Sequence, residues 1–517
     1  MEEPPDTADL RALARSLSRL MEAGARSLAA DAGPNEVSAK ITAHLRCEQS
    51  GIVPVAKRFP NWELVNVQGG VDAYIAAHGG DGGWFGLAGV MHRPHENLMM
   101  LITLAGGPFG APRLGAATFG TAPVGPDSNT DVVQLGMIAS VSPGGAPVII
   151  GIRYMAEFGP AVCHLDVLAP SQEAASATRD EIDRLIRVHD VFRGQVLSFS
   201  ASEHHGNELV TFLPRPAVAA SDVVLPGGVL ETIEQHIAGV ADWSRELIEA
   251  GQHLKRGLLL HGSPGTGKTH TVRYLTGRLT ASTVILLTGT SIRFIDQAAA
   301  LARRLQPSIL VLEDVDLVGM DRDFSGSSNP LLFSLLEAMD GVGADADVTF
   351  VLTTNRADIL EMALADRPGR VDLAVEIPRP DAACRERLLL LYARDLAFEG
   401  EVASIVAATD GVTASFVKEL IRRVVLASLR AGDGPPVLRS AYFDAVLAEM
   451  NGEHQSLTRS LLGSAPAAGS APAAGSVPAA GSVPAAGSVP AAGSVPAAGL
   501  ARPEPVHLRH RRHPPRT

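Results

Sequence analysis

One short stretch of the sequence combines glycines, a lysine and a threonine at a spacing suited to phosphate binding. It fits the pattern G-x-x-x-x-G-K-[ST] and consists of Gly262, Ser263, Pro264, Gly265, Thr266, Gly267, Lys268 and Thr269. Glycines allow backbone N–H groups to approach phosphate oxygens without an intervening Cβ atom. The Lys268 ammonium can reach the β- and γ-phosphates of a nucleotide, and the Thr269 hydroxyl can bind Mg²⁺. The stretch therefore predicts a phosphate-binding loop.

Two acids and an amide are the candidates for the rest of such a site. Glu313 and Asp314 follow an apolar run about 45 residues after the loop, and Asn355 follows another apolar run. Hydrolysis at a phosphate loop needs an acid that holds Mg²⁺ and a group that activates water. We assign Glu313 to Mg²⁺ and Asp314 to the water. Asn355 is expected either to polarise that water or to make a turn.

The elements around these residues predict how they are brought together. Apolar runs at 257–261, 283–288, 308–312 and 348–352 alternate with helical patterns. Such alternation is typical of a parallel sheet that is covered by helices on both faces. The loop then lies between a strand and a helix, whose N-terminus carries a positive dipole end. This context favours a phosphate loop over a glycine-rich turn that matches the pattern by chance.

The chain divides by pattern into four parts. We predict a separate α+β domain of unknown role over 1–215, an α/β domain over 220–380, a small helical domain over 381–452 and a disordered tail over 453–517. The tail repeats Gly, Ser, Pro and Ala and ends in a basic tip, a composition that cannot build a core. Four histidines in the first part, His92, His95, His204 and His205, are expected in exposed loops rather than at a metal.

Charge and hydropathy exclude several classes of protein. The formal net charge is −12, which argues against nucleic-acid binding by the folded body. The acidic N-terminus does not look like a secretory signal, and no apolar run approaches the ~18 residues of a membrane helix. Cys47, Cys163 and Cys384 are far apart and lack metal-ligand spacing. We expect a cytoplasmic protein that does not bind membranes.

Five motifs together resemble the AAA family of AAA+ ATPases. They are GSPGTGKT at 262–269, LVLEDVD at 310–316, LLEAMDGV at 335–342, TTNRAD at 353–358 and RPGRVD at 367–372. The resemblance covers about 220–450 and extends to stand-alone bacterial AAA ATPases with an uncharacterised N-terminal region. It implies a five-stranded parallel αβα core with a small helical lid, and ATP with Mg²⁺ as ligands. It also implies that Asn355 senses the γ-phosphate and that Arg367 and Arg370 act across a subunit boundary in a ring, usually a hexamer.

We therefore expect an ATPase that remodels a protein partner, with the N-terminal domain choosing the partner. The alternative is an ATP-gated scaffold or switch with little turnover. Two departures from the family pattern bear on this choice. Glu313 precedes Asp314, whereas the family usually has Asp before Glu, so the base is one methylene shorter and would need an extra water or a slightly closed site. The aromatic–glycine pair that grips substrate chains is missing from 289–307, so Phe294 is expected to pack in the core.

Overall fold

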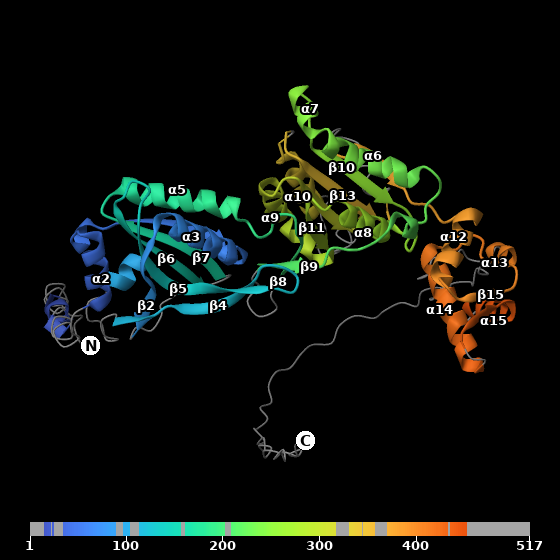
Figure 1. The fold of residues 1–517 in the computed structure, drawn as a ribbon, viewed down its shortest axis with the longest axis horizontal. Coiled ribbons are helices and arrows are strands. Elements are labelled where there is room, and N and C mark those ends of the chain that lie inside the picture. Colours follow the sequence, from blue (N-terminus) through green and yellow to red (C-terminus); the bar gives the residue numbers. More distant parts are fainter. Residues whose placement is uncertain are drawn as a thin grey trace, which may run out of the picture. The chain divides into compact units, whose positions relative to one another are not determined.

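A computed structural model describes most of the chain before residue 452 (Figure 1). The described ranges are 15–21, 23–24, 35–88, 97–103, 113–156, 161–201, 208–316, 330–343, 345–356, 370–432 and 435–451. The predicted tail and the residues His92, His95, His204 and His205 lie outside these ranges. Among the described residues, no helix is both long and apolar enough to cross a membrane.

The N-terminal part is built on an antiparallel sheet of seven strands in the order β1-β7-β6-β5-β2-β3, with β4 beside β5. The strands are β1 (Val53–Pro60), β2 (Gly80–Ala88), β3 (Arg113–Ala116), β4 (Thr118–Pro123), β5 (Asn129–Val141), β6 (Pro147–Ala156) and β7 (Ala161–Ala169). The helices are α2 (Glu36–Leu45), α3 (Leu64–His78), α4 (Leu98–Thr103) and α5 (Gln172–Val188). Helices α3 and α5 share one hydrophobic cluster with the sheet and lie on the same side of it in Figure 1, whereas α2 and α4 share another.

The second sheet contains the predicted parallel core. Its order is β14-β10-β13-β12-β11-β8-β9, and the first five of these strands run parallel. They are β10 (Arg256–His261), β11 (Thr283–Thr288), β12 (Ser308–Glu313), β13 (Val348–Thr354) and β14 (Leu373–Glu376). All four apolar runs identified in the sequence are strands of this core. The α/β phosphate-loop fold is therefore confirmed.

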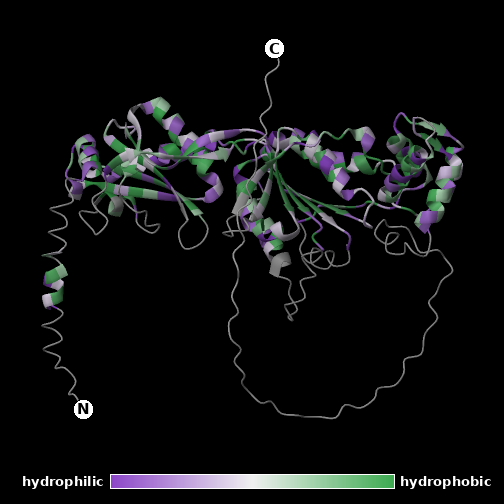
Figure 2. Cartoon of the chain, turned by 90° about the horizontal axis from the view of Figure 1, so that it is seen from below, coloured by the Kyte–Doolittle hydropathy of each residue, from purple (hydrophilic) through white to green (hydrophobic). Residues whose placement is uncertain are grey.

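Helices cover both faces of the parallel core, because its strands are apolar on both sides. Leu258 and Leu260 of β10 pack with α6 (Val229–Asp242) and α8 (Lys268–Arg278), whereas Leu259 packs with α9 (Ile295–Arg304) and α10 (Pro330–Asp340). The hydrophobic colour of these strands in Figure 2 reflects this two-sided burial. A short helix, α7 (Ser244–Glu249), precedes β10. The result is the three-layer arrangement expected for a parallel sheet.

The last two strands before residue 215 belong to the second sheet, although we predicted a separate domain over 1–215. β8 (Val196–Ala201) runs parallel to β11, and β9 (Glu208–Leu213) pairs antiparallel with β8. The predicted boundary at residue 215 thus follows a hairpin that pairs with the second sheet. The side-chain pattern of a hairpin shows which residues are buried, but not which third strand lies beside it. One hydrophobic cluster runs from α3 and α5 through this hairpin to α9.

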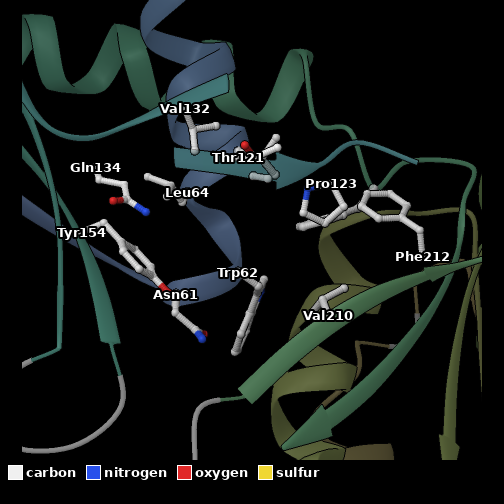
Figure 3. A pocket seen from close by; sticks show the side chains of 13 residues that line it. Asn61, Trp62, Leu64, Thr121, Pro123, Val132, Gln134, Tyr154, Val210 and Phe212 are labelled. Carbon is white, nitrogen blue, oxygen red and sulfur yellow. The ribbon is translucent and has the colours of Figure 1, made fainter. Parts of the chain in front are cut away.

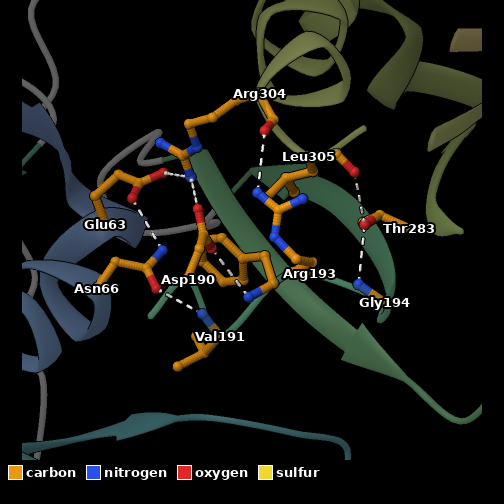
Figure 4. A network of polar contacts seen from close by, with 10 residues as sticks. Glu63, Asn66, Asp190, Val191, Arg193, Gly194, Thr283, Arg304 and Leu305 are labelled. Atoms are coloured by element: carbon orange, nitrogen blue, oxygen red, sulfur yellow. Dashed lines mark hydrogen bonds and ion pairs between the residues drawn. The ribbon is translucent and has the colours of Figure 1, made fainter. Parts of the chain in front are cut away.

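A buried ionic network fastens the N-terminal part to helix α9 (Figure 4). Arg304 lies 2.7 Å from a carboxylate oxygen of Glu63 and 2.9 Å from one of Asp190, whose side chains are 2% and 0% exposed. Asn66 donates to Glu63 and accepts a hydrogen bond from the backbone N–H of Val191. Burial raises the pKa of Asp190, and the charge of Arg304 opposes that rise. The network joins three elements that are far apart in the sequence.

The last described part is the predicted helical lid. It comprises α12 (Ala382–Ala393), α13 (Val402–Ala408), α14 (Ala414–Ala431) and α15 (Ser440–Asn451). A short parallel pair, β15 (Ala397–Glu399) and β16 (Val437–Arg439), was not expected from the sequence. The helices share a hydrophobic cluster of their own, which includes Phe416 and Phe443.

Candidate functional site

A polar cavity of about 410 Å³ lies at the carboxyl ends of β12 and β13, beside the glycine loop. Its lining comes from the loop, the start of α8, the two strand ends and the lid. The residues are Pro264, Gly265, Gly267, Lys268, Thr269, His270, Arg273, Asp314, Asn355 and Ser415. Carboxyl ends of parallel strands meet at one edge of a sheet, so the loop, Asp314 and Asn355 come together as the sequence predicts.

Two glycines give the loop a shape that other residues would not allow. Gly262 has a φ of 142°, and a Cβ atom there would lie 2.3 Å from the carbonyl oxygen of Ile377. Gly265 has a φ of 77°, and a Cβ atom there would lie 3.0 Å from the Ser415 hydroxyl. Since L-residues rarely adopt these φ values, the backbone can face a ligand only with glycine at these positions. The loop is thus a cradle that suits a phosphate group.

Lys268 is held inside this cradle at the first position of α8. Its ammonium donates to the carbonyl oxygens of Gly262 and Ser263, at 2.8 and 3.0 Å, and to Oδ1 of Asn355 at 2.8 Å. Burial lowers the pKa of Lys268, and the charges of Asp314 and Asp316 oppose this change. The cation therefore already sits among oxygen atoms, as it would when it binds a phosphate.

Asp314 has an unusual backbone conformation directly after β12. Its φ is 53°, which is uncommon for a residue other than glycine. The neighbouring strand β13 holds it there, because Thr353 accepts hydrogen bonds from the backbone N–H groups of Asp314 and Val315, both at 3.0 Å. Oδ1 of Asp314 accepts from the Asn355 amide at 3.3 Å. Such strain is typical of functional sites, and here it directs the carboxylate toward the cavity.

Glu313 is the last residue of β12 and meets the glycine loop through Thr269. Burial raises the pKa of Glu313 and the charge of Asp314 adds to this rise, whereas the nearby Thr269 hydroxyl and the charge of Arg273 oppose it. Mg²⁺ prefers hard oxygen ligands, and it is usually held by one or two protein oxygens together with phosphates. The pair Thr269 and Glu313 fits that requirement.

Asp316 is a part of the site that the sequence analysis did not assign. Its Oδ1 accepts from the Thr354 hydroxyl and from the backbone N–H of Asn355, both at 3.0 Å. The residue is buried, so it can fix the end of β13 and with it the Asn355 side chain. The four-residue run Glu313–Asp316 contains three acids, and residue types alone do not distinguish their tasks.

The lid also reaches the cavity. The backbone N–H of Ser415, at the start of α14, donates to the carbonyl oxygen of Gly265 at 3.1 Å. His270 and Arg273 of α8 add two basic groups to the lining. They lie two and five residues after Lys268. Their position on the helix after the loop is the only feature of the sequence that could have placed them in the lining.

Neither of the two predicted arginines, Arg367 and Arg370, is among the described residues that line the cavity. Arg370 is 2% exposed and donates through Nε to Asp340 at 2.9 Å and through Nη2 to the other oxygen of the same carboxylate. The structure therefore does not bring Arg370 to the nucleotide cavity of its own chain. The role across a subunit boundary that we expected for Arg370 stays a prediction. Arg367 lies outside the described residues.

Phe294, by contrast, lies where the sequence predicts. It ends a short 3-10 helix, η4 (Gly289–Phe294), between β11 and α9. Its side chain is buried in the cluster that joins the two sheets, with its ring centroid 6.1 Å from that of Phe199. The expected packing of Phe294 in the core is confirmed.

Comparisons with known proteins agree with this geometry. Residues 258–379 match the ATPase family associated with various cellular activities (AAA). The chain is 31% identical over 242 residues to the ATP-dependent zinc metalloprotease FtsH 3 of Sphaerobacter thermophilus, which covers 44% of the chain and 48% of that protein. It is 32% identical over 214 residues to the proteasome-activating nucleotidase of Methanocella arvoryzae, with coverage of 38% and 50%.

A third relative is the 26S proteasome regulatory subunit 10B of Dictyostelium discoideum, which is 32% identical over 199 residues and covered to 50% of its length. The chain thus spans about half the length of the curated relatives it matches. The family match at 258–379 contains the phosphate loop and strands β11 to β14, which follow it. The domain that contains the phosphate loop belongs to the AAA family of ATPases.

Proposed function

We propose that the chain binds MgATP in this cavity and hydrolyses it to ADP and phosphate. The observation that carries the proposal is the hydrogen-bonded series from Lys268 through Asn355 to Asp314, built from three separate elements around one cradle. In such a series the cation can bind the γ-phosphate, the amide can orient the attacking water, and the carboxylate can accept the proton of that water. AAA homologues are ATPases, which agrees with this assignment.

The residues divide the work as follows. Lys268 neutralises charge on the β- and γ-phosphates, and Thr269 with Glu313 holds Mg²⁺. MgATP itself supplies the metal charge that stabilises the leaving phosphate oxygens. Asn355 orients the attacking water, and Asp314 accepts its proton. The Asp314 side chain is one methylene shorter than that of glutamate, so we expect slow turnover.

We propose further that the protein works in the cytoplasm as a ring, usually a hexamer, that remodels a protein partner. The relatives named for proteasome activation and proteasome regulation support this reading at the level of the family. Arg367 and Arg370 are the candidates that complete the neighbouring subunit's site. The N-terminal part, which is fastened to α9 through Arg304, is the candidate surface for the partner. Nothing in the negative net charge favours nucleic acid as that partner.

The test compares nucleotide binding with turnover. We expect Lys268→Ala to abolish MgATP binding, and Asp314→Asn to bind MgATP while its turnover falls by about 10²-fold. Asp296→Asn is the matched control, because Asp296 is an exposed acid on α9. Specific activity should rise with protein concentration as rings assemble. The Asp314→Asn protein can then serve as a trap for the partner in extracts of the native cell.

The results distinguish an ATPase from an ATP-gated scaffold or switch, the two functions between which the sequence does not decide. Activity that is lost in Asp314→Asn and kept in Asp296→Asn supports an ATPase. Tight retention of nucleotide with negligible turnover in the unmodified chain would favour a scaffold or switch. Turnover of Asp314→Asn at the unmodified rate would refute the role given to Asp314.

A further inference from the structure

A second cavity, of about 260 Å³, lies between the N-terminal sheet and strand β9 of the ATPase sheet (Figure 3). One side is formed by η2 (Asn61–Glu63), the start of α3, and β4, β5 and β6. The other side is formed by Val210 and Phe212 of β9, which face Trp62 and Pro123 across the space in Figure 3. The cavity is far in the sequence from the phosphate loop, and the proposed ATPase reaction does not use it.

Aromatic rings fixed by their neighbours make up much of the wall. The Trp62 ring packs edge-on against Phe199, with their centroids 5.4 Å apart, and Phe212 packs against Phe192 at 5.6 Å. Aromatic faces attract other rings in stacked or edge-to-face arrangements. The wall is therefore preformed for a flat apolar group.

Polar groups without protein partners face this wall. Among the described residues, the Gln134 amide and the Tyr154 hydroxyl have no side-chain hydrogen bond to another residue, although both are partly buried. Burial raises the pKa of Tyr154, so its phenol stays neutral and able to donate. The described residues that line the cavity include no charged side chain. Partly buried polar groups are normally paired with protein or water, and a mainly apolar pocket with a few such groups is the usual form of a small-molecule site.

We propose that this cavity binds a small neutral aromatic molecule that carries one hydrogen-bonding group. An apolar cavity of about 150 Å³ can hold benzene, so 260 Å³ suits one or two rings. The rings would lie against Trp62 and Phe212, and the polar group would meet Gln134 and Tyr154. A charged ligand would lose its hydration without gaining a counter-charge. This inference goes beyond the proposed ATPase function and does not depend on it.

Because of the position of the cavity, a bound ligand should affect the stability of the junction between the N-terminal part and the ATPase sheet. Trp62 lines the cavity, and the next residue, Glu63, forms the ion pair with Arg304 of α9. A ligand that contacts both η2 and β9 binds only when the N-terminal part and the ATPase sheet are together. By mass action, it should stabilise that junction against thermal unfolding.

The test uses three neutral probes, indole, benzamide and 2-naphthamide, with 2-naphthoate as the charged counterpart of the last. Binding to the full chain is followed by isothermal titration calorimetry up to about 1 mM, the weak end of specific affinity. Val210→Trp fills the cavity from β9, and Thr211→Trp is the matched control because Thr211 is exposed on the same strand. Gln134→Leu removes the amide without filling the space, and it keeps the test available should Val210→Trp not fold.

We expect at least one neutral probe to bind saturably, with one site per chain, to the unmodified protein and to Thr211→Trp. Binding should weaken at least about tenfold in Val210→Trp and in Gln134→Leu, and 2-naphthoate should bind at least about tenfold more weakly than 2-naphthamide. The bound probe should also raise the melting temperature of the full chain. The absence of saturable binding by all three neutral probes would overturn the proposal, as would unchanged binding in both cavity variants.

Discussion

Replacement of Arg304 by methionine tests whether the ionic network holds the N-terminal part to the ATPase domain. Methionine keeps most of the apolar stem, so the change mainly removes a charge. It leaves the carboxylates of Glu63 and Asp190 side by side, with 2% and 0% of their side chains exposed. Loss of one partner from a buried ion pair costs about 3–5 kcal/mol. Because the Arg304 side chain is 29% exposed, water can solvate the two carboxylates in part after its removal. We therefore expect a loss of stability near the lower limit of this range.

The pH dependence of this loss has a definite sign. Burial already raises the pKa of Asp190, and Arg304 is the main group that opposes the rise. Without Arg304 the folded-state pKa of Asp190 increases further above its unfolded value, so folding takes up a proton. The stability deficit is therefore small below the unfolded pKa of about 4 and grows as pH rises through the folded-state pKa. We expect a larger loss at pH 8 than at pH 5.

The assay is urea unfolding followed by circular dichroism at both pH values. With an m-value of roughly 3 kcal/mol per M, a loss of about 3 kcal/mol moves the midpoint by about 1 M. Arg303→Met is the matched control, because Arg303 is exposed and donates instead to the carbonyl oxygen of Gly341. Adding Glu63→Gln and Asp190→Asn to Arg304→Met should restore part of the lost stability. Equal midpoints for Arg304→Met and Arg303→Met at pH 8, or a deficit that grows on acidification, would refute the reasoning.

Three further predictions concern the site and the core. Asp316→Asn should lower kcat by about tenfold, worth ~1.4 kcal/mol, with little change in KM for ATP in steady-state assays, because Asp316 acts on the position of the sensor amide. Arg367→Ala and Arg370→Ala should each cut turnover by about 10³-fold with nucleotide affinity intact. Arg370→Ala should also lower the free energy of unfolding by about 1–2 kcal/mol, a modest loss because its half-exposed partner Asp340 can be rehydrated. Phe294→Ala should cost about 3–5 kcal/mol of stability in denaturant unfolding, and an unchanged midpoint would place its ring outside the core.

The strands of the ATPase core could be predicted because each of them meets the same physical requirement. A parallel strand buried on both faces is a continuous apolar run, and β12 shows this clearly from Ser308 to Leu312. The polar residues that follow such runs must then lie at one edge of the sheet. The two requirements together predict that Asp314 and Asn355 lie beside the loop.

The same reasoning could not assign β8 and β9. Their apolar residues Leu197, Phe199, Val210 and Phe212 satisfy a hairpin in either sheet. The choice is made by hydrogen bonds of β8 to Val284–Leu286, more than 80 residues away, and side-chain types do not encode such pairing. Arg370 is a similar case, because its ion pair with Asp340 depends on where α10 ends in space.

The position of β8 changes how a nucleotide signal should reach the N-terminal part. Had the first domain been joined only by a linker, a change at Asp314 could reach it only through the ring. Instead β8 extends the ATPase sheet beside β11, and Arg304 ends the helix that leads into β12. A packed core transmits displacement rather than absorbing it. The N-terminal part should therefore move with the ATPase sheet, and the lid, whose contact with the loop includes the Ser415–Gly265 hydrogen bond, is the element free to turn against both when the nucleotide changes.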